Sequence, residues 1–575
     1  MAVSAAAQGL VRLPVWRARF VLATLALAFG VLAARSVYLQ ALKTEFLQER
    51  GDARYSRVID IPATRGRILD RNGDALAVST PVQSVWAIPA DVELSREQRR
   101  KLAALLAIEP AELGKKLASS RDFVFLKRQV PPDTAHAIAA LGLPGIYQHP
   151  EYRRYYPGGE ITAHVLGFTG VDDGGQEGVE LAHEATLGGK AGSRRVIKDR
   201  LGHIVEDVES IRVAQAGVDL QLSIDGKLQS LAYSALKSAV EANRAKAGGI
   251  IAVDVRTGEI LALANVPSFN PNNRAKLTGA QLRNRVITDL FEPGSTLKPF
   301  TVALALESGK VTPTTRIPTA PGTLTMGGYT IRDVHPAATM SVAQILQKSS
   351  NVGAAKLALA LPRESMWDLF RRVGFGTAPA LGFPGAAAGM LHPWKTWKPV
   401  EQATMAYGHG ISLSLVQLAR AYSLFARDGE LVPLSLVKTN AAASAEKVIS
   451  TETARAVRAM LELAVQPGGT APRARIAGWR VGGKTGTAHK QENGGYAADK
   501  YIASFVGFAP ASEPRLVIAV MIDEPAAGRY YGGSVAAPVF AQVMQGALRL
   551  MAVPHDAPLD PILLPEDADE AREST

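Results

Sequence analysis

Cysteine is absent from this chain of 575 residues. Its absence excludes disulfide bonds, thiolate nucleophiles and zinc sites that are built from cysteine. The ten histidines form no HExxH motif and no compact cluster, so we expect no metal ion.

Continuous basic runs are also lacking, although 64 Lys and Arg residues exceed 53 Asp and Glu residues and give a formal net charge of +11. The cationic residues are scattered, and they are not interleaved with aromatic residues as in nucleic-acid-binding surfaces. We therefore expect no nucleic-acid partner. A basic surface would still attract anionic lipid headgroups.

One long apolar run is present, near the N-terminus. Phe20–Leu42 holds 23 residues and is interrupted only near its far end, by Arg35. At 1.5 Å per residue, a helix of this length crosses the hydrocarbon core of a bilayer, which is about 30 Å thick. The uninterrupted part, Phe20–Ala34, would also suit a cleaved signal peptide, but the full length favours a single transmembrane anchor over residues 20–42.

The charges before this run predict its orientation. Residues 1–19 contain three arginines and no acid, and positive residues tend to stay on the cytoplasmic side of a membrane. We expect residues 1–19 in the cytoplasm and everything after residue 42 outside it.

The rest of the chain is too long for one core, and its pattern changes near residue 216. Residues 43–215 alternate short strand-like runs with turns, and helical spacing occurs over Arg96–Ala107, which predicts an elongated mixed domain. Residues 216–553 have hairpin patterns near both ends and a largely helical middle. This predicts an α+β domain in which an antiparallel sheet is flanked by helices.

Two hairpins and a tail complete this division. The first hairpin joins GGIIAVDV to ILALANV, and the second joins YIASFVGFAP to RLVIAVMID. Residues 554–575 carry seven acids, one arginine and four prolines, a composition that predicts an acidic disordered tail.

A first chemical motif stands at FEPGSTLK, which ends at Lys298. A helix that begins near Ser295 places Ser295 and Lys298 on one face, where a desolvated amine can take the hydroxyl proton. Pro299 removes a backbone donor from the first turn, so we expect a 3₁₀-like start. Alone, the pattern is also that of an N-cap serine followed by a solvated lysine.

A second motif is Ser349-Ser350-Asn351. A hydroxyl and an amide two residues apart can both face one cleft. Ser349 would pass a proton between Lys298 and a leaving amine, and Asn351 would hold a substrate amide. The alternative is an ordinary helix-capping turn.

A third motif is VGGKTGT, which ends at Thr487. It predicts a strand with glycines where another backbone approaches, so an extended peptide can pair along it. Lys484 and Thr485 would meet a carboxylate or carbonyl, and the N–H groups of Thr487 and Ser295 would form an oxyanion hole. Alone, the pattern also fits a lysine in a glycine-rich hairpin.

Together, the three motifs are more specific than any one of them. The motifs S-x-x-K, S-D-N and K-T-G are the signature of class A β-lactamases and penicillin-binding proteins. Here S-x-x-K, S-S-N and K-T-G-T occur in that order. Chance assembly of all three in suitable local contexts is remote.

Most of the chain resembles the class B penicillin-binding proteins. RGRILDRNGD from Arg65, YPGGE from Tyr156 and GQEGVEL from Gly175 resemble motifs of their membrane-proximal pedestal. YGHGISLSLVQLA from Tyr407 resembles the helix that follows their active-site elements. At the position of Asn351 the chain resembles the septal, FtsI-type members, because elongation-specific members tend to carry aspartate there. No glycosyltransferase motif of the bifunctional class A precedes these segments.

The resemblance implies a peptidoglycan D,D-transpeptidase. Ser295 would form the acyl-enzyme with a D-Ala-D-Ala stem peptide and release D-alanine, with Lys298 as the base and Ser349 as a proton relay. The remaining residues would bind the donor peptide: Asn351, Lys484, Thr485, Gly486 and Thr487. A second stem peptide's amine would then form the cross-link, and β-lactams would acylate Ser295 in the same way.

The resemblance also implies a location and partners. The enzyme would sit on the inner membrane with its catalytic domain in the periplasm. Its partners would be an FtsW-like glycan polymerase and other divisome membrane proteins. No cofactor is implied.

Rival functions remain open. An elongation-specific transpeptidase would share the chemistry. A D,D-carboxypeptidase or a β-lactamase would hydrolyse its acyl-enzyme, but an anchor and a pedestal have no use in a free hydrolase. A β-lactamase would also need a base for water, and nothing assigns that role to Glu364, the first acid after Asn351. A β-lactam sensor would need a signalling domain, for which residues 1–19 leave no room, and an inactive scaffold would have no reason to keep the motifs.

Overall fold

The computed structural model describes residues 14–42, 56–198, 204–439, 444–492, 495–560 and 562. Helix α1 (Val15–Val37) continues as a π-helical turn, η1 (Tyr38–Leu42). Within the described residues it is the one helix long and apolar enough to cross a membrane, and none of its residues is buried. It begins before the predicted boundary at Phe20, because the fixed φ and missing N–H of Pro14 suit a helix start.

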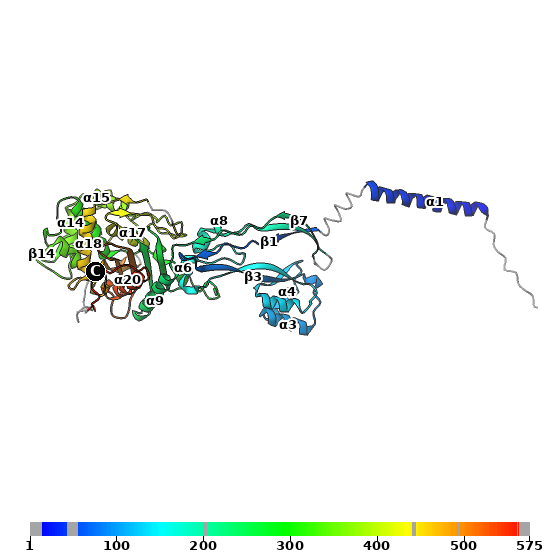
Figure 1. Cartoon of the computed structure of the whole chain (residues 1–575), viewed down its shortest axis with the longest axis horizontal. Helices are drawn as coiled ribbons and strands as arrows, with labels where there is room; N and C mark the ends of the chain where they lie inside the picture. The colour runs from blue at the N-terminus through cyan, green and yellow to red at the C-terminus, as the bar shows by residue number, and fades with distance from the viewer. Residues whose placement is uncertain are drawn as a thin grey trace, which may run out of the picture.

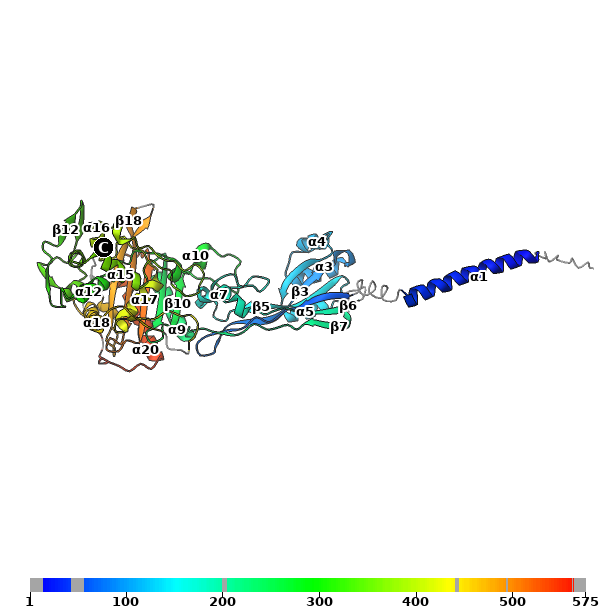
Figure 2. The ribbon, with the colours of Figure 1, turned by 90° about the horizontal axis from the view of Figure 1, so that it is seen from above.

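The elongated pedestal is made of two sheets that extend away from the C-terminal domain (Figures 1 and 2). A three-stranded antiparallel sheet has the order β1-β6-β7, and a second sheet has the order β4-β3-β2-β8 with β5 on β3. The strands are β1 (Ser56–Ile61), β2 (Ile68–Leu69), β3 (Ala75–Ala87), β4 (Val124–Val130), β5 (Ile146–Tyr155), β6 (Gly192–Lys198), β7 (Ile204–Arg212) and β8 (Leu220–Gln221).

Helices cover one face of the second pedestal sheet and form a small core of their own with it. They are α3 (Arg96–Leu106), α4 (Pro110–Leu117) and α5 (Pro132–Ala139). The predicted helix over Arg96–Ala107 is confirmed by α3. Ser95 and Gln98 form a capping box at its start, and Ala107 ends it in the left-handed conformation.

The C-terminal domain is built on a five-stranded antiparallel sheet with the order β10-β9-β19-β18-β17. Its strands are β9 (Ala247–Asp254), β10 (Ile260–Val266), β17 (Gly482–Glu492), β18 (Gly495–Ala509) and β19 (Leu516–Asp523). Strands β9 and β10 pair as one predicted hairpin, and β18 and β19 pair as the other. Both predictions are confirmed.

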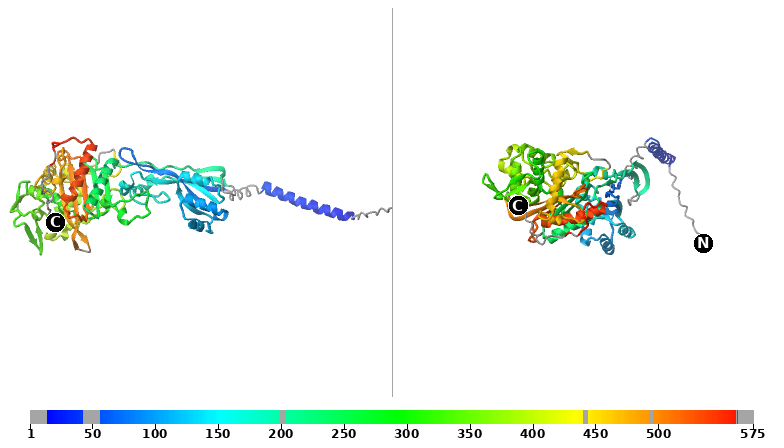
Figure 3. Two further views of the ribbon diagram at one scale, coloured as in Figure 1. Left: turned by 90° about the horizontal axis from the view of Figure 1, so that it is seen from below. Right: turned by 60° about the vertical axis from the view of Figure 1, so that its left-hand side comes forward.

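Helices lie on both faces of this sheet (Figure 3). Alternate residues of β9 belong to two cores: Ile250 packs in the core that contains α9 (Gly226–Ala242) and α20 (Ala537–Leu550), whereas Ile251 packs in the core that contains α17 (Leu415–Ala426). Burial on both faces explains why these strands are continuous apolar runs. The expected α+β arrangement is confirmed.

The prediction of a disordered tail over residues 554–575 starts the tail too early in the chain. Pro554–Asp560 contacts the domain: the His555 ring lies 4.1 Å from that of Trp479, and Trp479 Nε1 donates to the Pro554 carbonyl at 3.0 Å. The Trp479 ring and hydrogen bonds to the backbone hold this segment against the domain, although its composition alone predicts disorder. Residues 561 and 563–575 lie outside the described residues.

A buried ion cluster holds the pedestal motifs together. Glu180 is fully buried and accepts hydrogen bonds from Arg65 Nε at 2.7 Å and Arg154 Nε at 2.6 Å. Both arginines are also buried. Because unpaired charges are costly in a protein interior, both arginines depend on Glu180, and Arg65 also pairs with Glu184 at 2.8 Å. This cluster ties RGRILDRNGD to GQEGVEL across the fold.

We predict that Glu180→Gln destabilises the pedestal by about 3–5 kcal/mol, because it leaves the buried Arg154 guanidinium without its carboxylate and Arg65 with only the partly exposed Glu184. Urea titration read by hydrogen exchange in β3 and β5 measures this loss. Glu97→Gln is the control, since Glu97 pairs with Lys101 on the surface and its loss should leave the midpoint unchanged. Equal midpoints for wild type and Glu180→Gln would contradict the prediction.

Candidate active site

The first motif forms a tight turn into a buried helix. A 3₁₀ turn, η4 (Gly294–Leu297), leads into α12 (Lys298–Glu307), with Pro299 in its first turn. The expected 3₁₀-like start is therefore confirmed, and its cause is the missing N–H of proline. Ser295 is 2% exposed and Lys298 is fully buried, which excludes the alternative of a solvated lysine.

Lys298 joins the first two motifs. Its Nζ lies 2.6 Å from Ser295 Oγ, 3.0 Å from Ser349 Oγ and 2.9 Å from the Ser349 carbonyl oxygen. One nitrogen therefore contacts both hydroxyls. A proton can pass between the two serines through Lys298 without a large movement of any group.

Ser349 occupies an unusual backbone conformation. Its φ is +60°, in the left-handed region that non-glycine residues seldom adopt. It stands between α13 (Val342–Gln347) and α14 (Asn351–Leu359). Strained backbone of this kind is found at functional sites, where the surrounding structure holds it.

Asp333 secures the second motif. Ser350 is the N-cap of α14 and donates its hydroxyl to Asp333 Oδ2 at 2.6 Å, while Val352 N donates to Oδ1 at 2.9 Å. Asn351 Nδ2 donates to the Arg332 carbonyl at 3.2 Å. Its buried Oδ1 has no hydrogen-bond partner in the described structure, so a donor that reached it would relieve the cost of an unpaired acceptor.

The third motif lies on the edge strand β17. Lys484 is fully buried, with Nζ 3.1 Å from Thr485 Oγ1, which in turn lies 2.9 Å from Thr470 Oγ1. Thr487 Oγ1 accepts from Gly532 N at 3.0 Å. The unpaired edge of β17 suits the addition of a peptide strand.

Glycines let β17 lie against the nucleophile turn. A Cβ on Gly486 would stand 2.7 Å from the Pro293 carbonyl oxygen, and one on Gly294, whose φ is +56°, would stand 3.3 Å from the Thr487 carbonyl oxygen. The approaching backbone at these glycines is thus the chain's own turn. The contact brings the Thr487 backbone beside Gly294, the residue before Ser295.

A buried carboxylate beside this turn was not foreseen from the sequence. Glu292 accepts from Gly410 N at 2.8 Å, Gln491 Nε2 at 3.0 Å and the Tyr496 hydroxyl at 3.0 Å. Burial raises the pKa of Glu292. Its position three residues before Ser295 was the available signal, but its partners are remote in sequence.

The segment YGHGISLS is also a site element, and not part of a helix as expected. Helix α17 begins only at Leu415, because Ser414 caps it. Before it, Gly408 (φ +89°) packs so closely on Gly294 that a Cβ would stand 2.2 Å from the Gly294 carbonyl oxygen. Burial, together with the charges of Lys298 and His489, lowers the pKa of His409 to about 4.

All eight residues predicted for the site are buried. Direct contacts join Ser295, Lys298 and Ser349, and glycine contacts place β17 beside Ser295. Among the described residues, no group of three or more His, Asp or Glu side chains could hold a metal ion.

Comparison with known families agrees with this geometry. Residues 60–222 match the Penicillin-binding Protein dimerisation domain, and residues 248–545 match the Penicillin binding protein transpeptidase domain.

Curated relatives match over nearly the whole chain. Identity is 44% over 548 residues with a probable peptidoglycan D,D-transpeptidase PenA of Neisseria gonorrhoeae, covering 94% of each chain. It is 43% over 549 residues with the peptidoglycan D,D-transpeptidase FtsI of Escherichia coli, covering 94% of this chain and 93% of that one.

A solved structure matches the catalytic half. The apo transpeptidase domain of Burkholderia pseudomallei penicillin-binding protein 3 is 50% identical, with a TM-score of 0.55, and the match covers 59% of this chain and 98% of that one. The buried Ser–Lys–Ser cluster, the KTGT edge strand and these matches lead to one conclusion: the chain belongs to the penicillin-binding protein family of peptidoglycan D,D-transpeptidases.

Proposed function

We propose that this protein cross-links peptidoglycan stem peptides at the division septum through an acyl-enzyme on Ser295. The observation that carries the assignment of residues is the contact of Lys298 Nζ with both Ser295 Oγ and Ser349 Oγ in a water-poor site. The septal role is supported by Asn351 in the second motif and by the FtsI relative.

Acylation follows from this contact. Lys298, once its amine has released its own proton, takes the hydroxyl proton as Ser295 Oγ attacks the carbonyl between the two D-alanines. The backbone N–H groups of Ser295 and Thr487 stabilise the negative oxygen of the tetrahedral intermediate. As the C–N bond breaks, the proton passes from Lys298 through Ser349 to the departing D-alanine amine.

Cross-linking reverses the proton path. The amine of a second stem peptide attacks the ester carbonyl, and its proton passes to Lys298. The ester C–O bond breaks, and Ser295 recovers a proton from Lys298. The enzyme returns to its first state with one new peptide bond formed for the one broken.

The donor peptide is proposed to lie along β17. Strand addition would place its backbone on the free edge, with the open Oδ1 of Asn351 accepting an amide N–H on the acyl side. Lys484 and Thr485 would meet the terminal carboxylate, and Gly486 and Thr487 would line the strand.

A β-lactamase is disfavoured, because class A enzymes of that kind use a glutamate to activate the water that deacylates them. The two buried carboxylates next to the motifs, Glu292 and Asp333, are engaged by donors from Gly410, Gln491, Tyr496, Ser350 and Val352. Neither is placed as a base for water by these contacts.

The chain is membrane-anchored, and its orientation and partners are part of the proposal. The apolar α1 and the arginines before it support an N-terminus in the cytoplasm and a catalytic domain in the periplasm, on the inner membrane. We propose an FtsW-like glycan polymerase and other divisome membrane proteins as partners, and a division of the chain into a pedestal (43–215) and a transpeptidase domain (216–553).

We predict that Ser295→Ala abolishes covalent labelling by penicillin, because Ser295 supplies the hydroxyl of the nucleophile turn, 2.6 Å from Lys298 Nζ. Loss of a nucleophile can reduce the rate by about 10⁶-fold. Mass spectrometry of the penicillin-treated protein locates the adduct. Ser308→Ala, at the far end of the same helix, is the control and should label normally. An adduct on any residue other than Ser295 contradicts the assignment.

We predict that Lys298→Arg is nearly as damaging as loss of the nucleophile. Arginine keeps the positive charge but does not release its proton, so it cannot act as a base. Stopped-flow acylation by a chromogenic β-lactam measures the effect, with Lys310→Arg as the surface control. Acylation at the wild-type rate would show that Lys298 acts only as a charge.

We predict a smaller loss for Asn351→Ala, at about 2–4 kcal/mol of transition-state stabilisation, as for one positioned hydrogen-bond partner. The second-order rate constant for acylation by a peptide-like thioester measures it. Asn243→Ala, on the outer end of α9, serves as the matched amide control. A loss below about 1 kcal/mol would mean that Oδ1 of Asn351 does not bind the substrate.

A further inference from the structure

A short pedestal helix reaches into the transpeptidase domain. All four residues of α6 (Ala163–Leu166) are buried, and the His164 ring packs edge-to-face on Phe269, with centroids 5.5 Å apart. Phe269 follows β10 in the sheet of the other domain. His164 is thus a pedestal residue whose ring packs on a transpeptidase residue.

His164 holds both ends of a four-residue segment in that domain. Its Nε2 lies 2.7 Å from the Gln281 carbonyl oxygen, and its own carbonyl accepts from Asn284 Nδ2 at 3.0 Å. Because a carbonyl oxygen only accepts, Nε2 carries the hydrogen. Burial lowers the pKa of His164 to about 4, so the ring is neutral at physiological pH.

Buried amides extend this link to the next helix. Asn265 on β10 donates to Asn284 Oδ1 at 2.9 Å, and its own Oδ1 accepts from Val286 N at 2.9 Å. Asn265 and Asn284 are 1% and 7% exposed. Buried amides are costly when unpaired, so the loss of one bond disturbs its neighbours.

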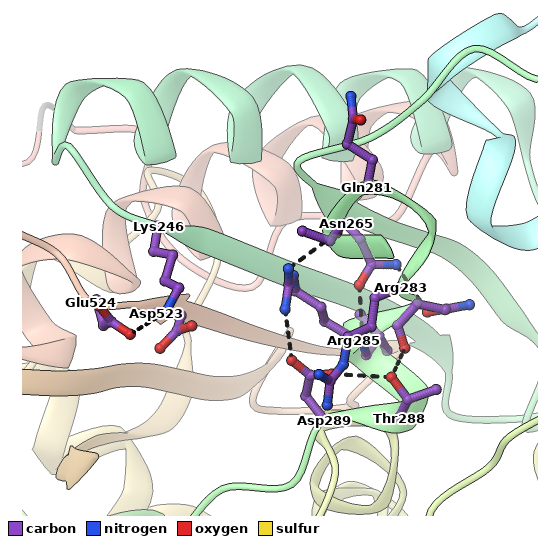
Figure 4. A network of polar contacts seen from close by, with 12 residues as sticks. Lys246, Asn265, Gln281, Arg283, Arg285, Thr288, Asp289, Asp523 and Glu524 are labelled. Atoms are coloured by element: carbon purple, nitrogen blue, oxygen red, sulfur yellow. Dashed lines mark hydrogen bonds and ion pairs between the residues drawn. The ribbon is translucent and has the colours of Figure 1, made fainter. Parts of the chain in front are cut away.

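The helix at the end of this chain of bonds leads to the nucleophile. Figure 4 shows Asn265 on its strand, with Gln281 above it and Arg285 beside it, and Arg285 pairs with Asp289 at 3.0 Å. Helix α11 (Arg285–Thr288) is fixed by these contacts. Phe291, three residues beyond it, exchanges two backbone hydrogen bonds of 3.0 Å with Leu413, and η4 follows.

We propose that His164 is a positioning residue through which the pedestal sets the geometry of the segment that carries Ser295. The pedestal then influences the rate of acylation as well as holding the catalytic domain away from the membrane. This inference rests on the proposed function for its kinetic consequence, but the linkage itself is a property of the fold.

A matched control exists at the same interface. Asn272 exchanges hydrogen bonds with the Tyr156 backbone, at 3.0 Å from Tyr156 N and 2.9 Å to Tyr156 O. This contact also joins the pedestal to the transpeptidase domain, but within the described residues Asn272 makes no hydrogen bond to residues 281–295. Asn272→Ala therefore weakens the interface without cutting the proposed route.

The test compares four variants of the full-length protein in detergent: His164→Leu, His164→Gln, Asn284→Ala and Asn272→Ala. The limiting rate constant of acylation and the dissociation constant of the preceding complex are measured with fluorescent penicillin. We expect His164→Leu and Asn284→Ala to lower the limiting rate about tenfold, with the dissociation constant changed less than about threefold. His164→Gln, which keeps a donor near the position of Nε2, and Asn272→Ala should stay within about threefold of wild type.

Hydrogen exchange provides a readout that does not need acylation. His164→Leu and Asn284→Ala should speed exchange in the peptide that covers residues 285–297, and Asn272→Ala should not. Unchanged exchange there, or equal effects of His164→Leu and Asn272→Ala on the acylation rate, would overturn the proposal. Absence of any adduct on Ser295 in wild type would instead refute the proposed function, while the exchange data would still decide the linkage.

Discussion

The site depends on the complete burial of Lys298. A lysine side chain removed from water needs hydrogen-bond partners, and here the hydroxyls of Ser295 and Ser349 and a backbone carbonyl supply them. The interactions that satisfy the buried amine are therefore those that proton transfer uses. Loss of either serine would disturb both the packing and the chemistry.

Close backbone contacts build the remainder of the site around this lysine. Gly294, Gly408 and Gly486 lie where a side chain would collide with a neighbouring main chain. Through them the nucleophile turn touches both the loop before α17 and the edge strand β17. The positive φ of Ser349 costs conformational energy. The hydrogen bonds from Ser350 and Val352 to Asp333 hold the following residues in place and so help to keep this conformation.

The pedestal depends on buried polar interactions, in which each charged or polar group must have a partner. Arg65, Glu180 and Arg154 form an ion cluster within it, and His164 continues into the amides of the transpeptidase domain. Buried polar networks specify one arrangement, since a shifted one would leave charges or amides unpaired. An elongated domain that contains such networks can fix the position of a catalytic centre relative to a membrane anchor.

Local features of the fold and site were determined by the sequence itself. The 3₁₀ start follows from Pro299, the pairing of Ser295 with Lys298 follows from helical spacing, and both hairpins follow from apolar runs and turns, because each depends on neighbouring residues. The motifs also predicted that Ser349 meets Lys298. The tertiary structure alone decided other meetings of distant groups: Glu292 with Tyr496, and His164 with Asn284. It also decided that Pro554–Asp560 packs on Trp479, and that residues before Leu415 form a loop of the active site. Such contacts arise when whole helices and strands pack against one another. Rules of local backbone conformation or hydrophobic periodicity therefore do not predict them.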